Sequence, residues 1–271
     1  MIATLDPLQV PAAPPSPEDR VRELQQTVSA SRLSLYLSCR LKFFFRYIAR
    51  LRKPKTAALH VGSSVHATLK AWNKSRWRGE ELTLKQLHEE FMRAWANTEE
   101  GPVQWDGKEV SERTTGWRLL DTYIRAQPFP PKPEAVEVPV EAELKQHGLP
   151  RIIGILDLVQ GSKIVDYKTS SQTPNPERVA HTMEVQTTIY ALLYRENTGR
   201  EELGIELHHL VKLKQPKVVI TPLPPMNEDQ KARVFTLMES YQEGLDRRDF
   251  VPSPGLQCLH CEYFAECRRW R

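Results

Sequence analysis

The spacing of apolar residues along the chain changes with position. From Ser29 to about Pro128 it is helical, with predicted helices over about 62–77, 84–97 and 108–127. Three Val- and Ile-rich runs then alternate with period two at 135–144, 151–159 and 163–169, which predicts consecutive antiparallel strands. Further helices are predicted near 177–197 and 227–246, and further strands near 205–212 and 218–221. This order favours an α/β or α+β fold with one central mixed sheet.

The composition changes at the N-terminus. Residues 1–28 open with a Pro- and Ala-rich tract, which predicts a flexible tail with at most a short helix near its end. Residues 29–271 are expected to form one domain. Its parts are a helical region at 29–134, a core at 135–225 and a C-terminal helix with a cysteine-bearing segment at 226–271.

Composition and charge exclude some classes of protein. Hydrophobic residues make up 40% and charged residues 27% of the chain, as in a globular protein. No apolar run approaches the roughly 20 residues that span a bilayer, and the N-terminus lacks a signal-peptide pattern. We therefore expect a cytoplasmic protein without membrane contact. The net charge of +4 permits a nucleic-acid partner without requiring one.

Two acids and a lysine interrupt the most apolar strands. Asp157 shares a strand face with Ile153 and Ile155, and Asp166 and Lys168 share a face on the next strand. A short turn joins the strands, so the three charged side chains can meet near one end of the sheet. Their mutual compensation as a structural ion pair is one interpretation. The other is a divalent-cation site, because two adjacent carboxylates repel each other and Mg²⁺ is usually held by one or two carboxylates.

The order of motifs resembles a known family. Asp157 followed by Asp166-Tyr167-Lys168 is similar to the core of the PD-(D/E)xK nucleases, although Leu156 stands where the motif name calls for proline. The set Gly62-x-x-x-His66, Gly154-x-x-Asp157, Asp166-x-Lys168 and Gln186-x-x-x-Tyr190 resembles the RecB-type branch. The resemblance runs from about Ser31 to Cys267 and implies a restriction-endonuclease-like core, with a central mixed sheet flanked by helices.

The resemblance implies roles for these residues. His66, Asp157, Asp166 and the backbone carbonyl of Tyr167 would bind one or two Mg²⁺ or Mn²⁺ ions, and Lys168 would orient the attacking water and stabilise developing charge. The helix that carries Gln186 and Tyr190 would face the active site, where the two side chains hold DNA or the lysine. Taken singly, His66 is more often a packing residue, and Gln186 and Tyr190 an ordinary surface pair.

The implied activity is that of a metal-dependent DNA nuclease. We expect an exonuclease on single-stranded ends that leaves 5′-phosphate and 3′-hydroxyl ends and serves DNA repair or recombination. The chain has no Walker A motif, so a helicase would be a separate subunit. Two alternatives stay open: a CRISPR-adaptation nuclease that acts with an integrase, and a non-catalytic DNA-binding subunit that keeps the fold.

The four cysteines have the spacing of a metal site. Cys258, Cys261 and Cys267 form C-x₂-C-x₅-C, and Cys39 lies far upstream. Four thiolates can hold Zn²⁺ or an iron–sulfur cluster, and the spacing alone does not distinguish them. The arrangement resembles the iron–sulfur clasp of AddB-type and CRISPR-adaptation nucleases, which implies a [4Fe–4S] cluster that ties the two ends of the chain together. His260 lies inside the motif and could replace a cysteine ligand, but we favour a position beside the metal site.

Basic residues crowd the region around Cys39. Aromatic residues lie among them at 43–45 and 47, which suits binding of single-stranded nucleic acid. For the phenylalanines we favour burial in a core, and for the basic residues an ordinary solvated face is equally compatible with the sequence. The basic residues are Arg32, Arg40, Lys42, Arg46, Arg50, Arg52, Lys53 and Lys55, with Arg268, Arg269 and Arg271 at the C-terminus.

Overall fold

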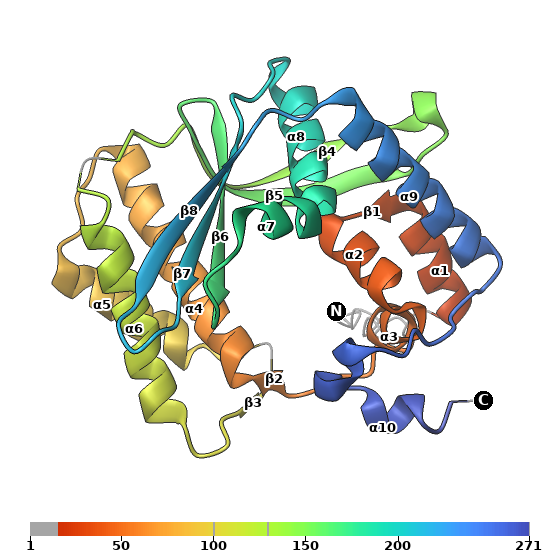
Figure 1. Ribbon diagram of the computed structural model, residues 1–271, viewed down its shortest axis with the longest axis horizontal. Helices are drawn as coiled ribbons and strands as arrows, with labels where there is room; N and C mark the ends of the chain where they lie inside the picture. The colour runs from red at the N-terminus through yellow and green to blue at the C-terminus, as the bar shows by residue number, and fades with distance from the viewer. Residues whose placement is uncertain (1–15, 100, 129, 271) are drawn as a thin grey trace, which may run out of the picture.

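A computed structural model describes residues 16–99, 101–128 and 130–270. Its main sheet has six strands in the order β1-β5-β6-β7-β8, with β4 paired to β5 (Figure 1). The β1–β5 and β6–β7 pairs are parallel and the others antiparallel, so the sheet is mixed. The strands are β1 Thr27–Val28, β4 Ala135–Ala142, β5 Arg151–Gln160, β6 Lys163–Ser170, β7 Ile205–Val211 and β8 Lys217–Leu223. The predicted fold class, a mixed α/β architecture with a central mixed sheet, is confirmed.

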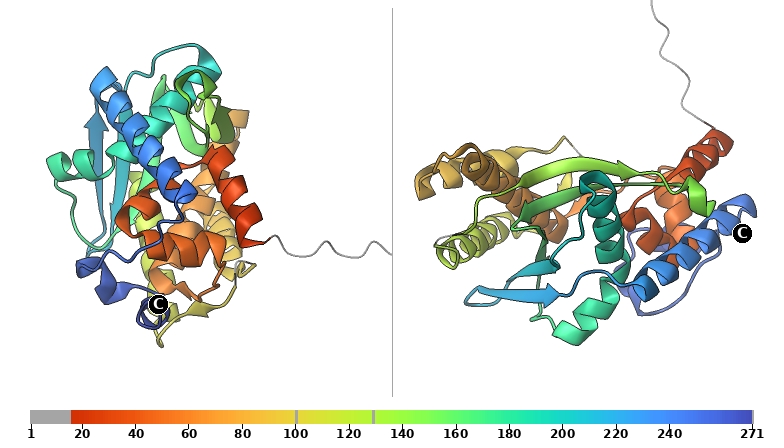
Figure 2. Two further views of the ribbon diagram at one scale, coloured as in Figure 1. Left: turned by 90° about the vertical axis from the view of Figure 1, so that its right-hand side faces the viewer. Right: turned by 90° about the horizontal axis from the view of Figure 1, so that it is seen from above.

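Helices cover both faces of the sheet (Figure 2). One face carries α4 Ala57–Arg78, α5 Leu84–Ala96 and α6 Glu109–Arg125. The other carries α1 Pro17–Gln26, α2 Ala30–Ser38, α7 Pro176–Thr182, α8 Glu184–Thr198 and α9 Glu228–Asp246. Smaller elements are α3 Arg40–Phe43, the π-helix η1 Phe44–Ile48, η2 Lys145–His147, η3 Leu256–His260, α10 Phe264–Cys267, and the two-residue strands β2 Lys55–Thr56 and β3 Val103–Gln104.

Two hydrophobic cores result, one on each face. The α8-side core includes Ile152, Leu156, Ile189 and Leu207, and the α4-side core includes Val65, Leu69, Leu158, Val165 and Leu210. No helix in the described ranges is both long enough and apolar enough to cross a membrane.

The short helix predicted near the end of residues 1–28 is present as α1, and it packs against the domain. Ser16 caps α1 with a capping box, and the helix buries Val21 and Leu24 against the α8-side core. Val28 is also buried and extends the sheet beside Ile152 of β5. Apolar residues three and four apart supply the burial that the proline-rich stretch lacks. Residues 1–15 lie outside the described residues.

The helix boundaries differ from the sequence prediction in two places. The helix expected to begin at Gly62 begins at Ala57, because the Thr56 side chain accepts a hydrogen bond from the Leu59 N–H. The helix expected over 177–197 is divided at Met183 into α7 and α8. The helix predicted to begin at 84 does begin there, behind a capping box formed by Thr83 and Gln86.

Candidate active site

The separation of β5 from β6 creates the site. The two strands pair only from Leu158↔Val165 to Gln160↔Lys163. Asp157 and Asp166 follow directly beyond the last pair, where the strands part. The backbone N–H of Tyr167 donates to Oδ2 of Asp157 at 3.1 Å and fixes this carboxylate against β6. The predicted meeting of the two aspartates therefore takes place at the point where the ladder ends.

Asp166 and Lys168 belong to a chain of polar contacts with α8. The ammonium of Lys168 lies 2.7 Å from Oδ2 of Asp166, in an ion pair that lacks hydrogen-bond geometry. Lys168 donates to Oε1 of Gln186 at 3.0 Å, and Nε2 of Gln186 lies 3.0 Å from Oδ1 of Asp166. Nε2 of Gln186 also lies 2.8 Å from the Tyr190 hydroxyl, and burial raises the pKa of Tyr190. The structure thus brings together four of the predicted site residues: Asp166, Lys168, Gln186 and Tyr190.

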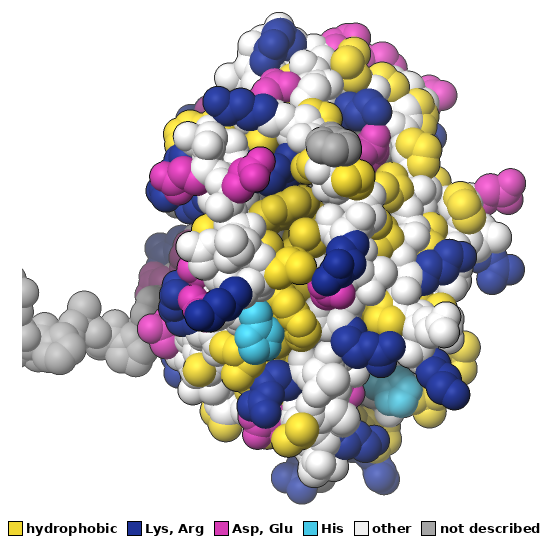
Figure 3. All heavy atoms as spheres, turned by 90° about the vertical axis from the view of Figure 1, so that its left-hand side faces the viewer, with side chains coloured by type: hydrophobic (Ala, Val, Ile, Leu, Met, Phe, Trp, Pro, Cys, Tyr) yellow, Lys and Arg dark blue, Asp and Glu magenta, His cyan; other side chains and the backbone are white. Residues whose placement is uncertain are grey.

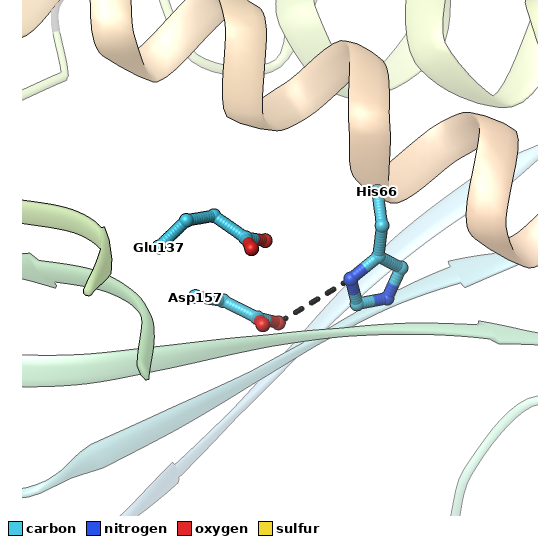
Figure 4. Close-up of side chains that lie close together, drawn as sticks. All are labelled: His66, Glu137 and Asp157. Carbon is cyan, nitrogen blue, oxygen red and sulfur yellow. Dashed lines mark ion pairs between the residues drawn. The ribbon is translucent and has the colours of Figure 1, made fainter. Parts of the chain in front are cut away.

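Two further side chains of the kind that bind metals, those of His66 and Glu137, point toward Asp157 (Figure 4). His66 on α4 directs Nδ1 toward Oδ2 of Asp157 at 3.5 Å. One ligand atom from each of His66, Glu137 and Asp157 lies within 4.8 Å of the others. An imidazole with two carboxylates is a donor set that suits a divalent cation.

Electrostatics at Asp157 are unfavourable without a cation. Burial raises the pKa of this carboxyl to about 6, and the nearby carboxylates of Asp166 and Glu137 add to the rise. His66 and the Tyr167 N–H oppose it. The protein therefore holds three carboxylates close together at an energetic cost, which is common at functional sites. A divalent cation would remove that cost, so these residues fit the ion.

Glu137 is the residue that the sequence analysis missed. It lies on β4 opposite Asp157, between the pairs Val136↔Leu158 and Val138↔Leu156, and its φ of 50° is left-handed. Such a φ is rare for a residue other than glycine, asparagine or aspartate. Nζ of Lys70 lies 3.3 Å from its carboxylate. The hint in the sequence was an acidic residue inside a Val-rich strand, but an acid on an edge strand normally faces solvent.

The alternation of side chains along the paired strands β4 and β5 is interrupted at Glu137 and Asp157. Residues of the same parity face one side of the sheet before this point and the other side after it. Ala142 and Ile152 pack in the α8-side core, whereas Val136 and Leu158 pack in the α4-side core. All four have even numbers, so a regular ribbon would keep the residues of each strand on one face. The change of side at this point turns both carboxylates toward His66, and the left-handed φ of Glu137 accompanies it.

Two motif glycines allow the helices to approach. A Cβ on Gly62 would lie 3.2 Å from Oγ1 of Thr169, so Gly62 permits α4 to pack closely on β6 and to present His66. A Cβ on Gly154 would lie 2.7 Å from Cδ1 of Leu193, so Gly154 permits α8 to pack on β5. The glycines of the two motifs thus bring helices to the sheet rather than make turns.

Comparison with known proteins identifies the family. The sequence matches the profile of the PD-(D/E)XK nuclease superfamily over residues 27–268. The chain belongs to the PD-(D/E)XK nuclease superfamily. Nucleases of this superfamily hydrolyse phosphodiester bonds and use divalent metal ions such as Mg²⁺ or Mn²⁺.

One solved structure agrees with this assignment at the level of the fold. A candidate exonuclease from Eubacterium rectale has a TM-score of 0.57 and 16% sequence identity, covering 93% of this chain and 90% of its own. The structure of SSO0001 has a TM-score of 0.37 and 13% identity, covering 92% of this chain and 94% of its own. No curated protein sequence matches the chain.

The four cysteines of this PD-(D/E)XK protein gather at one end of the molecule. Cys39 follows α2, Cys258 and Cys261 lie at η3, and Cys267 ends α10. All four are free thiols. Partial burial and the charges of the other three thiols raise the pKa of Cys267, so Cys267 lies within electrostatic range of each of them.

Ion pairs and hydrogen bonds join the two ends of the chain beside these cysteines. Lys42 pairs with Glu262 and Lys53 with Glu266, each at 2.7 Å. Arg40 also pairs with Asp249, the Leu41 N–H donates to the Val251 carbonyl at 3.1 Å, and the Tyr263 hydroxyl donates to the Leu51 carbonyl at 2.9 Å. We call this region, residues 39–53 with 249–267, the clasp.

The aromatic and basic residues of the clasp have separate roles. Phe43 and Phe45 are buried, as predicted for core residues. Three of the basic residues are paired with acids of the C-terminal segment and are not free for a nucleic acid. On the face formed around α5 and α6, basic side chains are dispersed with acidic ones between them (Figure 3).

Proposed function

We propose that the protein is a metal-dependent DNA exonuclease of the RecB-like branch, acting on single-stranded ends in DNA repair or recombination. The observation that carries this is the convergence of His66, Asp157, Asp166 and Lys168 where β5 and β6 part. The exonuclease-like neighbour from Eubacterium rectale, similar over most of both chains, supports the same direction. Residues 29–271 would act as one nuclease domain, with β1 and α1 packed onto it.

His66, Asp157 and Asp166, with the backbone carbonyl of Tyr167, would hold one or two Mg²⁺ or Mn²⁺ ions. A bound cation supplies Lewis-acid stabilisation of the phosphate charge and lowers the pKa of the attacking water. The raised pKa of Asp157, which reflects its burial and, to a smaller extent, the nearby carboxylates, supports this assignment. Glu137 would add a third carboxylate to the site once its ion pair with Lys70 is broken.

Lys168 would orient the attacking water and stabilise charge that develops on the phosphate. Gln186 holds Lys168 and Asp166 in fixed relation through its amide, since its oxygen accepts from the lysine while its nitrogen lies 3.0 Å from the aspartate. Tyr190, beside Gln186, would contact the DNA backbone. Attack on the side opposite the 3′ oxygen would leave 5′-phosphate and 3′-hydroxyl ends.

Digestion of end-labelled single-stranded DNA with Mg²⁺ and with Mn²⁺ tests this function. The parent should release nucleotides from an end, whereas Asp166→Ala and Lys168→Ala should do so at least about 1,000-fold more slowly. Lys163→Ala is the matched control, because Lys163 lies on the same strand but pairs with Glu206 at 2.8 Å outside the site. Equal activity of Lys168→Ala and the parent would overturn the enzyme proposal and favour a non-catalytic DNA-binding subunit.

We propose that the clasp holds a [4Fe–4S] cluster through Cys39, Cys258, Cys261 and Cys267. Four thiolates make a complete ligand set for such a cluster. They come from both ends of the chain, and Cys267 lies within electrostatic range of the other three.

Anaerobic purification followed by metal analysis and an absorbance spectrum tests the cluster. The parent should be coloured and contain iron, and a Cys→Ser variant at any of the four positions should lose both. His260→Ala, a change inside the cysteine motif, should keep the colour. Stoichiometric zinc without iron would contradict the cluster.

A further inference from the structure

A buried histidine lies beside the catalytic lysine on the neighbouring strand. In the parallel β6–β7 pair, Lys168 is in register with His209 and Asp166 with Leu207. Register partners in adjacent strands place their side chains on the same face of the sheet, about 4.8 Å apart. His209 therefore shares the face of Asp166 and Lys168, and its imidazole interacts electrostatically with both.

The imidazole of His209 has an unused polar atom. The side chain is 6% exposed, and Nδ1 has no hydrogen-bond partner among the described residues. Buried polar atoms are nearly always partnered, so an unpartnered one beside a proposed active site calls for an explanation. Burial lowers the pKa of His209, which favours a neutral ring with one acceptor nitrogen.

Lys168 has donors that match this acceptor. An ammonium has three N–H groups. One donates to Oε1 of Gln186, and the contact with Asp166 is an ion pair without hydrogen-bond geometry. Asp166 is also a proposed cation ligand, so its carboxylate has two competing partners. A cation on Asp166 would weaken the hold of this carboxylate on Lys168.

We propose that His209 is a positioning residue that accepts a hydrogen bond from Lys168 through Nδ1. It holds the ammonium toward the substrate when the Asp166 carboxylate is engaged by a cation. This inference rests on the proposed nuclease function. It adds to the site a residue from β7, which lies outside the four motifs that carry the family resemblance.

Paired variants of adjacent histidines provide the test. His209→Leu removes the acceptor at similar volume, whereas His209→Asn keeps an acceptor near the position of Nδ1. His208→Leu is the matched control, because His208 is 2% exposed on the same strand but bonds Tyr123 at 2.7 Å on the opposite face. Both leucine variants perturb β7, so the unfolding free energy of each is measured alongside kcat and KM.

The expected result is a fall in kcat of about 10- to 100-fold for His209→Leu, with KM and Mn²⁺ affinity within about 3-fold of the parent. His209→Asn should recover most of the loss, and His208→Leu should lose stability without a comparable fall in kcat. In a Lys168→Ala background, His209→Leu should have no further effect, because both changes remove the same interaction.

Three outcomes would overturn the inference: parental kcat in His209→Leu, no recovery in His209→Asn, or an undiminished effect in the Lys168→Ala background. A readout without catalysis is the ¹⁵N resonance of His209 Nδ1, which should move toward that of a hydrogen-bonded acceptor when Mg²⁺ is added and stay unchanged in Lys168→Ala. A parent that neither cleaves DNA nor binds Mg²⁺ would instead refute the proposed function. A parent that does both, with an unmoved Nδ1 resonance, would refute the role of His209 alone.

Discussion

The active site and the clasp use charged residues in opposite ways. At the active site, Glu137, Asp157 and Asp166 are held close together, and the pKa of Asp157 rises to about 6. In the clasp, each of the acids Asp249, Glu262 and Glu266 faces a basic partner from the segment around Cys39. At the site three carboxylates outnumber the two ammonium groups of Lys70 and Lys168, which costs stability and suits a cation, whereas acids paired one to one at a junction fasten two segments.

The largest expected effect comes from removing a charge that the active site concentrates. Asp166→Asn should lower DNA cleavage by at least about 1,000-fold, because a cation ligand and the partner of Lys168 are lost together. Asp121→Asn, a change in an exposed ion pair with Arg125 at 2.8 Å, should leave activity unchanged. Cleavage rates with Mg²⁺ for the two variants and the parent provide the measurement. Near-parental cleavage by Asp166→Asn would mean that the concentrated charge has no role in catalysis.

The clasp should respond through stability rather than through catalysis. We predict that Cys→Ser at any of the four positions gives an unstable or aggregating protein, because the proposed metal-centred crosslink between distant segments would be lost. The measurement is the midpoint of thermal unfolding together with the fraction of monomer in size-exclusion chromatography. A quadruple Cys→Ser variant with parental stability would show that the ion pairs and hydrogen bonds suffice to hold the clasp.

The free energy of unfolding should depend on pH because the pKa of the buried Asp157 carboxyl is raised. The pKa of Asp157 in the folded protein is about 6, above its ordinary value of 3.8, so the folded state binds this proton more tightly than the unfolded state. This group therefore favours folding most at low pH, and its contribution falls by about 2 kcal/mol as the pH rises from about 4 through 6.

Unfolding free energies in EDTA between pH 4 and 7 check this prediction. Asp157→Asn should lack the decrease and be more stable than the parent at pH 7. Saturating Mg²⁺ should remove the difference, because a cation compensates the carboxylates. The same pH dependence in Asp157→Asn and the parent would mean that another group causes the loss of stability.

The smallest effect is expected for a single ion pair of the clasp. Lys42→Ala should cost at most about 1 kcal/mol, because Lys42 and Glu262 are both partly exposed to solvent. DNA cleavage should be unchanged. A loss of cleavage at parental stability would indicate that Lys42 contacts the nucleic acid and that the contrast between the two regions is incomplete.

Much of the site could be predicted from sequence because it is encoded locally. Asp166 and Lys168 are two residues apart on a strand, and Gln186 and Tyr190 four apart on a helix, so local periodicity places each pair on one face. Similarly, Thr83 and Gln86 define the start of α5 through a local capping box. In each case the side chains that matter are neighbours in the chain.

The parts that were missed depend on contacts between distant segments. Glu137 reaches the site through a left-handed φ and a change of side in the β4–β5 ribbon, and no residue type in the sequence of β4 specifies either. The packing of α1 and β1 onto the sheet depends on β5, more than 100 residues later. The division between α7 and α8 at Met183 has no glycine or proline to announce it.

The central claim is that a divalent cation is bound where β5 and β6 part. The most direct measurement is a crystal structure of the protein soaked in Mn²⁺, with an anomalous difference map. We expect a peak within coordination distance of His66, Asp157 and Asp166. A map without a peak there, with the side chains of Asp157 and Asp166 turned away from each other, would contradict it.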